Sequence, residues 1–291
     1  MQTLSCQRGL CPVNPPTFQV LLEIPQSQTD ALRDVYRAGY LQGDSPAQDQ
    51  LTRMVPVADS SSDEWHPAWA PDGRPAFLSE RGKAGVYVQG PCQPEPVVTR
   101  RHIQSFAASP DGSQWAFVAP EPGRDEPSLF TMAAGTKPVP VPLGELIPRQ
   151  VAYAPDGSLV FRTDDALYRV SQGLVSPLAR GEFYDFALSP AGDKLVYVKP
   201  DDFEIGCHLR LRDLASGREH TLIHTWNEPD VYEWPVYQRP SFSPDGSRVL
   251  YGVTSMESWG APLAFDLRVI SVDGGPSSIL ADDVVAARPQ P

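Results

Sequence analysis

Five short segments of the chain repeat one five-residue phrase. It consists of a mostly bulky residue, a small residue, Pro, Asp or Ala, and Gly. The copies are 69–73 (WAPDG), 108–112 (ASPDG), 153–157 (YAPDG), 188–192 (LSPAG) and 242–246 (FSPDG). Their prolines lie 39, 45, 35 and 54 residues apart, the period of a four-stranded propeller blade. Because such a blade buries its two faces only against neighbouring blades, the repeat constrains the whole architecture.

Each phrase predicts a tight turn between two antiparallel strands. Pro fixes φ for the second turn position, Asp bonds nearby backbone amides, and Gly supplies the positive φ that follows. Ala191 replaces Asp in the fourth copy, so we expect that turn to lose its side-chain bond and keep its backbone geometry.

Apolar residues also recur in register around the turns, which indicates strands packed closely on both faces. The residues two positions before each turn proline are Trp69, Ala108, Tyr153, Leu188 and Phe242. The aromatic residues six or seven positions after it are Phe77, Phe117, Phe161, Tyr197 and Tyr251.

The two ends of the chain complement each other as parts of one further blade. The C-terminal 288–291 (RPQP) resembles 239–242 (RPSF), where an inner strand precedes the fifth turn. Near the N-terminus, 18–24 (FQVLLEI), 35–41 and 50–57 have the pattern of the second, third and fourth strands. We therefore predict an all-β, six-bladed propeller of four-stranded antiparallel blades, with one blade closed by both termini, a join that removes exposed strand edges.

The expected organisation is a tail at 1–16 and a single propeller domain at 17–291. Five complete repeats fall within 63–285, and the sixth blade combines 17–57 with 286–291. Two alternatives remain open: a helix over 30–41, where Leu32, Val35, Tyr36 and Gly39 have helical spacing, or a chain that stops in the middle of a repeat.

Composition narrows the possible partners. The formal net charge of −12 argues against nucleic acid or an anionic membrane, because phosphates need clustered Lys and Arg. Basic proteins, peptides or cations fit better, although the charge is equally explained by solubility. No apolar run approaches the roughly 20 residues that span a bilayer.

The four cysteines predict no metal site. Cys6, Cys11, Cys92 and Cys207 form no CxxC pair and lack a nearby His at zinc-ligand spacing. Cys6 and Cys11 are either a small bridged loop of an exported protein or free thiols, and Cys92 and Cys207 are interpreted as packing residues. The first residues lack the basic start and apolar core of a signal peptide.

The period and the Ser/Ala-Pro-Asp-Gly phrase together resemble the TolB-like propeller repeats, also called PD40 or WD-like repeats. The resemblance covers about 63–291 and, less securely, 17–57. It implies a six-bladed propeller, usually exported to the periplasm or cell envelope of bacteria, that acts through contacts with proteins. TolB itself adds a separate α/β domain, for which the roughly 60 residues before the first full repeat are too few. Prolyl peptidases also carry propellers, but this chain has no GxSxG motif.

One polar column points to the central channel. The residues five positions before each turn proline, with Arg288 as the expected sixth, are polar in every copy: His66, Ser105, Gln150, Asp185, Arg239 and Arg288. A position near the entry of the inner strand faces the axis of a propeller. The column is either a solvated channel wall or a pocket for a small ligand or cation.

Two long loops of the fifth repeat form a second candidate. The spacing widens to 54 residues here, and the loops at 225–237 and 254–262 mix aromatic with acidic residues. The candidate recognition residues are Trp226, Glu228, Asp230, Tyr232, Trp234 and Trp259. These rings either fold back onto the blade or bind a partner, as exposed Trp and Tyr do at interfaces.

The sequence therefore favours a non-enzymatic scaffold, monomeric, that binds a protein or peptide. The alternative is a small-ligand or cation site in the channel, with or without catalysis. No catalytic residue, metal site or cofactor is predicted, because no nucleophile, phosphate-binding loop or metal constellation is recognisable.

Overall fold

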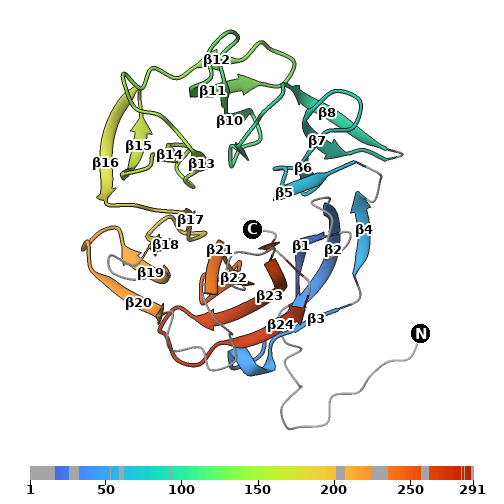
Figure 1. Ribbon diagram of the computed structural model, residues 1–291, viewed down its shortest axis with the longest axis vertical. Helices are drawn as coiled ribbons and strands as arrows, with labels where there is room; N and C mark the ends of the chain where they lie inside the picture. The colour runs from blue at the N-terminus through green and yellow to red at the C-terminus, as the bar shows by residue number, and fades with distance from the viewer. Residues whose placement is uncertain are drawn as a thin grey trace, which may run out of the picture.

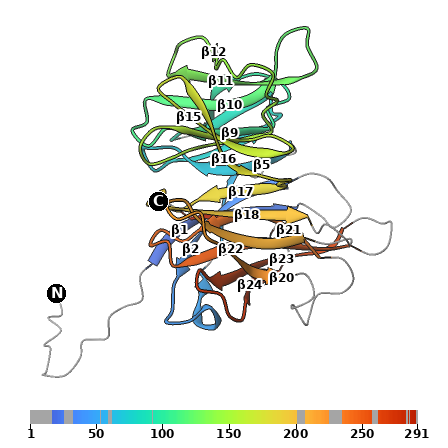
Figure 2. The same cartoon turned by 90° about the vertical axis from the view of Figure 1, so that its left-hand side faces the viewer.

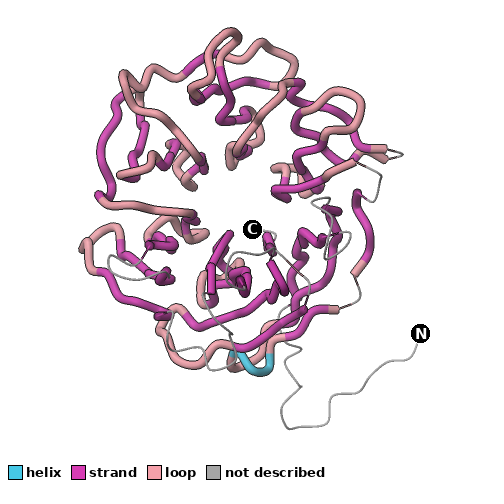
Figure 3. The backbone as a smooth tube through the Cα atoms, in the orientation of Figure 1, coloured by secondary structure: helices cyan, strands magenta, loops and turns pink. Residues whose placement is uncertain are grey.

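The computed structural model describes residues 17–25, 33–52, 54–58, 62–91, 93–200, 207–224, 235–256, 262–282, 284 and 286–289. Six antiparallel sheets stand around a central axis, as Figures 1 and 2 show from the face and the side. Strands and loops make up almost all of the described chain, with one 3-10 turn, Pro46–Gln48, drawn in cyan in Figure 3. The prediction of an all-β six-bladed propeller is confirmed.

We number the blades from the first complete repeat and give their strands from the axis outward. Blade one contains β5 (Glu64–Trp69), β6 (Pro75–Ser79), β7 (Gly85–Gln89) and β8 (Pro94–Thr99). Blade two contains β9 (Ser105–Ala108), β10 (Gln114–Pro120), β11 (Pro127–Ala133) and β12 (Val139–Pro140). Blade three contains β13 (Gln150–Tyr153), β14 (Leu159–Arg162), β15 (Ala166–Ser171) and β16 (Leu174–Arg180).

The second half of the ring follows the same order. Blade four contains β17 (Asp185–Leu188), β18 (Lys194–Pro200), β19 (Cys207–Asp213) and β20 (Glu219–His224). Blade five contains β21 (Pro235–Phe242), β22 (Arg248–Met256), β23 (Pro262–Ser271) and β24 (Ser278–Asp282). Blade six contains β25 (Ala286–Pro289), β1 (Thr17–Pro25), β2 (Arg33–Leu41), β3 (Gln50–Leu51) and β4 (Val55–Ala58).

Blade six joins the two ends of the chain. β25 supplies its innermost strand and pairs antiparallel with β1, with Val20 opposite Pro289 and Glu23 opposite Ala286. The expected fourth strand at 50–57 is split into β3 and β4, which both pair with β2. The alternative of a helix over 30–41 is wrong, because β2 occupies most of that range and pairs along its length with β1.

Apolar side chains fill the spaces between adjacent blades. A buried cluster lies at each of the six junctions. The aromatic column after the turns contributes to them, and its members are at most 2% exposed: Phe77, Phe117, Phe161, Tyr197 and Tyr251. Among the described residues, the buried members of the cluster between blades six and one are Leu21, Val35, Phe77 and Tyr87.

The turn glycines show why the Pro-Asp/Ala-Gly phrase recurs. Gly112 and Gly192 have φ of 76° and 71°, which only glycine adopts at little cost. A Cβ added to Gly112 would lie 2.9 Å from Pro71 Cβ, and one added to Gly192 would lie 2.8 Å from Pro155 Cδ. These turns therefore pack, glycine against proline, on the turn of the preceding blade.

The fourth turn has no carboxylate at the position where the other turns accept a backbone amide, as in the bond from Ser113 N–H to Asp111. That side-chain bond is absent with Ala191, as expected, and Gly192 keeps the positive φ of the turn. A second bond is nevertheless kept. Asp193, two residues after Ala191, accepts a hydrogen bond from Ser189 Oγ at 2.7 Å, as Asp111 and Asp245 do from Ser109 and Ser243.

The glycine packing predicts a difference between two otherwise similar substitutions. Gly157→Ala introduces only an unfavourable positive φ of 81°, with open space around the new Cβ, and should cost about 1 kcal/mol of unfolding free energy. Gly192→Ala adds the clash with Pro155 and should cost about 1–3 kcal/mol more. Urea unfolding followed by circular dichroism measures both values. Equal losses would show that the glycine–proline contact contributes nothing to stability.

Candidate functional site

The polar column lies on the inner strands, where most of its members link adjacent blades. Val151 N–H of blade three donates to Ser105 Oγ of blade two at 3.2 Å. Gln150 Nε2 donates to Asp185 Oδ1 of blade four at 2.5 Å. Asp185 Oδ2 in turn accepts from Arg239 N–H of blade five at 2.8 Å. Three consecutive junctions are therefore bridged by column residues.

Glu23 links blade six to both of its neighbours, blades five and one, where the ring closes. Its carboxylate is fully buried on β1, where it pairs with the Arg239 guanidinium of blade five and accepts from His66 N–H of blade one at 2.8 Å. Arg33 also pairs with Glu23, at 3.1 Å, and with Asp63, at 2.8 Å. The His66 ring lies 5.3 Å from the Phe106 ring of blade two, which completes the circle.

Local backbone geometry orients the N–H groups of His66 and Arg239 toward their acceptors. His66 and Arg239 have positive φ values of 54° and 49°, and each lies in a bulge that interrupts the pairing of β5 or β21. A bulge releases an N–H from the strand ladder, so that it can bond outside its own sheet. Here the released amides reach the carboxylates of the preceding blades, Glu23 and Asp185.

Most column residues thus form hydrogen bonds between blades, which the side chains of a merely solvated channel wall would not need to do. Ser105 is 1% exposed. His66 and Gln150 do line the cavity described below. Arg288 lies in β25 opposite Leu21, as its place in the column requires. Whether the column also binds a ligand stays a hypothesis.

Glu23 was not singled out from the sequence, although a single carboxylate in the apolar run 18–24 was an available signal. The two long loops cannot be followed in the same way, because Trp226, Glu228, Asp230, Tyr232, Trp234 and Trp259 lie outside the described residues. The strands that flank both loops end at one edge of blade five, where Met256 pairs with Pro262 and Pro235 with Ser255. This edge is opposite the turn at 243–247.

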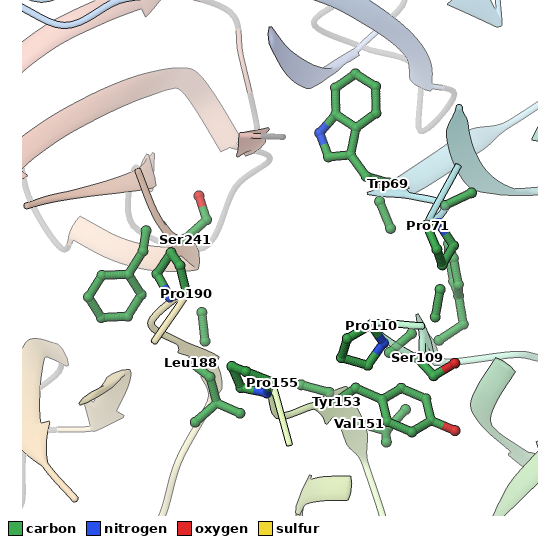
Figure 4. Close-up of a pocket in the computed structure, with 18 of the residues that line it drawn as sticks. Trp69, Pro71, Ser109, Pro110, Val151, Tyr153, Pro155, Leu188, Pro190 and Ser241 are labelled. Atoms are coloured by element: carbon green, nitrogen blue, oxygen red, sulfur yellow. The ribbon is translucent and has the colours of Figure 1, made fainter. Parts of the chain in front are cut away.

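A hollow opens on the side of the ring where the repeated turns lie. It measures about 660 Å³ and lies among the five repeated turns and the ends of their inner strands. We call it the mouth. Figure 4 shows part of its wall, with the labelled residues Trp69, Pro71, Pro110, Tyr153, Pro155, Leu188 and Pro190. Phe242 and Pro244 also line the mouth. Prolines and bulky apolar side chains thus dominate the wall, with His66 and Gln150 among the polar members.

The sequence pattern does not predict the mouth as a site, because its residues occupy positions that are typical of turns and of the core. The bulky column two residues before each proline was interpreted as packing, whereas Trp69, Tyr153, Leu188 and Phe242 also line this opening. The structure shows that the inner strands end here, so these side chains converge from several blades. A bulky residue next to a turn was the available signal.

Other candidate chemistry has little support in the described chain. No group of three or more His, Cys, Asp or Glu that could hold a metal ion occurs among the described residues. Cys207 is buried between blades four and five, where burial raises the pKa of its thiol to about 11. Cys6, Cys11 and Cys92 lie outside the described ranges. No helix in the described part is long and apolar enough to cross a membrane.

Glu23 generates a prediction about ring closure. Glu23→Gln removes the buried carboxylate that pairs with both Arg33 and Arg239, so it should lower the unfolding free energy by about 3 kcal/mol. The exposed pair of Asp72 with Arg74 provides the control, and Asp72→Asn should cost less than about 1 kcal/mol. Urea unfolding at neutral pH tests both. A loss for Glu23→Gln no larger than the control would contradict the role of Glu23.

No protein-family model matches the sequence, and no curated protein matches it significantly. Solved structures do match the fold. TolB from Acinetobacter baumannii is 21% identical with a TM-score of 0.72, and the match covers 94% of this chain and 66% of that one. The chain thus spans just under two thirds of TolB.

Two further structures show how widely the fold is used. A chain of the nidogen/laminin complex is 10% identical with a TM-score of 0.65, over 94% of this chain and 98% of that one. Oligogalacturonate lyase in complex with manganese is 11% identical with a TM-score of 0.56, over 90% and 80%. At these identities the likeness concerns the fold alone. The chain has the six-bladed propeller fold of the TolB type.

Proposed function

We propose that the protein is a non-enzymatic scaffold that binds a peptide segment of a protein partner in the mouth. The observation that carries this proposal is the wall itself: an open hollow of about 660 Å³ with prolines and aromatic rings converging from several blades. Rigid rings bury large areas at small entropic cost, which is why aromatic residues dominate the energetics of many interfaces.

The rigidity of the wall also supports binding. The turn prolines have a fixed φ, and the turns of blades one and two, and of three and four, contact each other through Pro71 with Gly112 and Pro155 with Gly192. Below them the inner strands are linked from blade to blade by Gln150, Asp185 and Glu23. A site that is formed before the partner arrives loses little entropy on binding.

The alternative, a catalytic or small-ligand site in the channel, has less support. Gln150, Asp185 and Arg239 use their polar atoms in contacts between blades, and a bound ligand would have to compete for them. Relatives in fold include both a chain from a complex of two proteins and a lyase, so the fold itself favours neither class.

Filling the mouth should abolish peptide binding. Ala108 lies half-buried on the wall, so Ala108→Trp should occupy the hollow, and peptides selected from a random 12-residue display library on the wild-type chain should bind it at least about tenfold more weakly. Val139→Trp places the same ring on the outer edge of the same blade, at a side chain that is 60% exposed, and should leave binding unchanged. Isothermal titration calorimetry with resynthesised peptides measures both dissociation constants.

Circular dichroism and melting temperature establish that the variants are folded. Full binding by Ala108→Trp would remove the mouth as the site. If alanine at Trp226, Trp234 and Trp259 then abolished binding, the site would instead be on the opposite face, at the loops of blade five.

A further inference from the structure

Among the turn glycines of blades two to five, Gly157 differs from the other three in its distance from the preceding turn. The Cβ positions of Gly112, Gly192 and Gly246 lie 2.9, 2.8 and 3.8 Å from the proline of the preceding turn. At Gly157, in blade three, no atom of the described residues lies within 4 Å of the corresponding position. The turns of blades two and three therefore stand apart, and a second hollow of about 310 Å³ lies between them.

This second hollow is continuous with the mouth. The two share Ser109, Pro110, Tyr153 and Pro155 in their walls. Figure 4 shows the Tyr153 ring at the boundary, with its hydroxyl directed away from the centre of the mouth. A group bound in the mouth thus has a side pocket directly beside it.

The side pocket carries negative charge that the protein leaves unbalanced. Asp111 accepts hydrogen bonds from Ser109 Oγ at 2.6 Å, Ser113 N–H at 3.0 Å and Ser113 Oγ at 2.8 Å. These neutral donors lower the pKa of Asp111 to about 2, so the carboxylate is ionised at neutral pH. The other aspartate of the side pocket, Asp156, pairs with Arg169.

Asp111 differs in this respect from the carboxylates of the turns in blades one and four. Asp72 pairs with Arg74, and Asp193 pairs with Lys194. Asp111 forms no ion pair with any of the described residues. Unlike these three aspartates, it offers a whole negative charge to a ligand. Asp245 of blade five also forms no ion pair with a described residue, but it accepts a hydrogen bond from Gln42 Nε2 and lies outside the side pocket.

Tyr153 lies in the wall that the side pocket shares with the mouth. Its hydroxyl oxygen is buried and makes no hydrogen bond to the described residues, and a rotation of the side chain would bring it to a ligand in the side pocket. Burial, with a smaller contribution from the charge of Asp111, raises the pKa of Tyr153 to about 12, so the phenol is neutral. A buried hydroxyl without a partner is costly, and a donor from a ligand would remove that cost.

We propose that this side pocket, formed by Ser109, Asp111, Ser113, Tyr153 and Asp156, binds the cationic head of an Arg or Lys side chain on the peptide that occupies the mouth. The proposal rests on the proposed function and adds its specificity. Ammonium and guanidinium groups have donors only, which suit the carboxylate of Asp111 and the oxygen of Tyr153. A guanidinium can also stack against an aromatic ring. The partner is thus a segment with an apolar or aromatic residue beside a cationic one, which also complements the net charge of −12.

The test replaces the cationic side chain of the peptide with a neutral side chain of similar shape. Peptides selected on the wild-type chain are resynthesised with citrulline in place of Arg or norleucine in place of Lys, and their dissociation constants are measured by calorimetry. We expect neutral peptides to bind the wild type about tenfold more weakly. Asp111→Asn should weaken the parent peptide by a similar factor and should no longer distinguish the two peptides.

Two further variants distinguish the effect of the side pocket from the effect of the overall negative charge of the protein. Asp193→Asn removes an equal charge from the turn of blade four, where Lys194 already balances it and where the side chain lines neither hollow, and should keep the preference for the cation. Tyr153→Phe keeps the ring and removes only the hydroxyl, so it should reduce the preference by about threefold, and it decides the matter if Asp111→Asn fails to fold.

The outcomes are distinct. Selected peptides that lack Arg and Lys, neutral peptides that bind as well as charged ones, or equal effects of Asp111→Asn and Asp193→Asn would each overturn the side pocket while leaving the mouth as a binding site. A library that yields no peptide for the wild-type chain would overturn the mouth and the side pocket together.

Discussion

A propeller is stable only if its ring is closed, because each sheet has two apolar faces that no element outside the ring covers. Here the chain closes the ring by pairing β25 with β1, which brings residues from the two ends of the sequence into one blade. Next to this pairing, the buried carboxylate of Glu23 contacts His66, Arg33 and Arg239. A polar network therefore links blades five, six and one where the ring closes, alongside the apolar cluster between blades six and one.

The repeated turn contributes both to the packing of the ring and to the wall of the mouth. The glycines of the turns in blades two and four pack against the proline of the preceding turn, and the turn prolines line the mouth. The proposed binding site is therefore formed largely by the geometry that repeats around the axis. The proposed side pocket lies where the turns depart from this packing, at Gly157.

The polar column illustrates how one pattern admits two explanations. Polar residues at the entry of every inner strand are expected both in a ligand site and in a ring whose blades are bonded to each other. The hydrogen bonds of Gln150, Asp185 and Arg239 support the second explanation. The mouth above them differs, because prolines, alanines and bulky apolar side chains make up most of its wall.

The sequence alone determined the blade count, the turns, the aromatic core column and the joining of the two termini, because these follow from a period of about 40 residues and from local turn chemistry. It also placed His66, Gln150 and Asp185 near the axis. The partners of these residues, the role of Glu23, the mouth and the side pocket at Asp111 and Tyr153 appeared only in the tertiary structure. The physical reason is that each of them is a contact between different blades. The distance between neighbouring turns, which decides whether a glycine meets a proline or leaves a cavity, is set by packing around the whole ring.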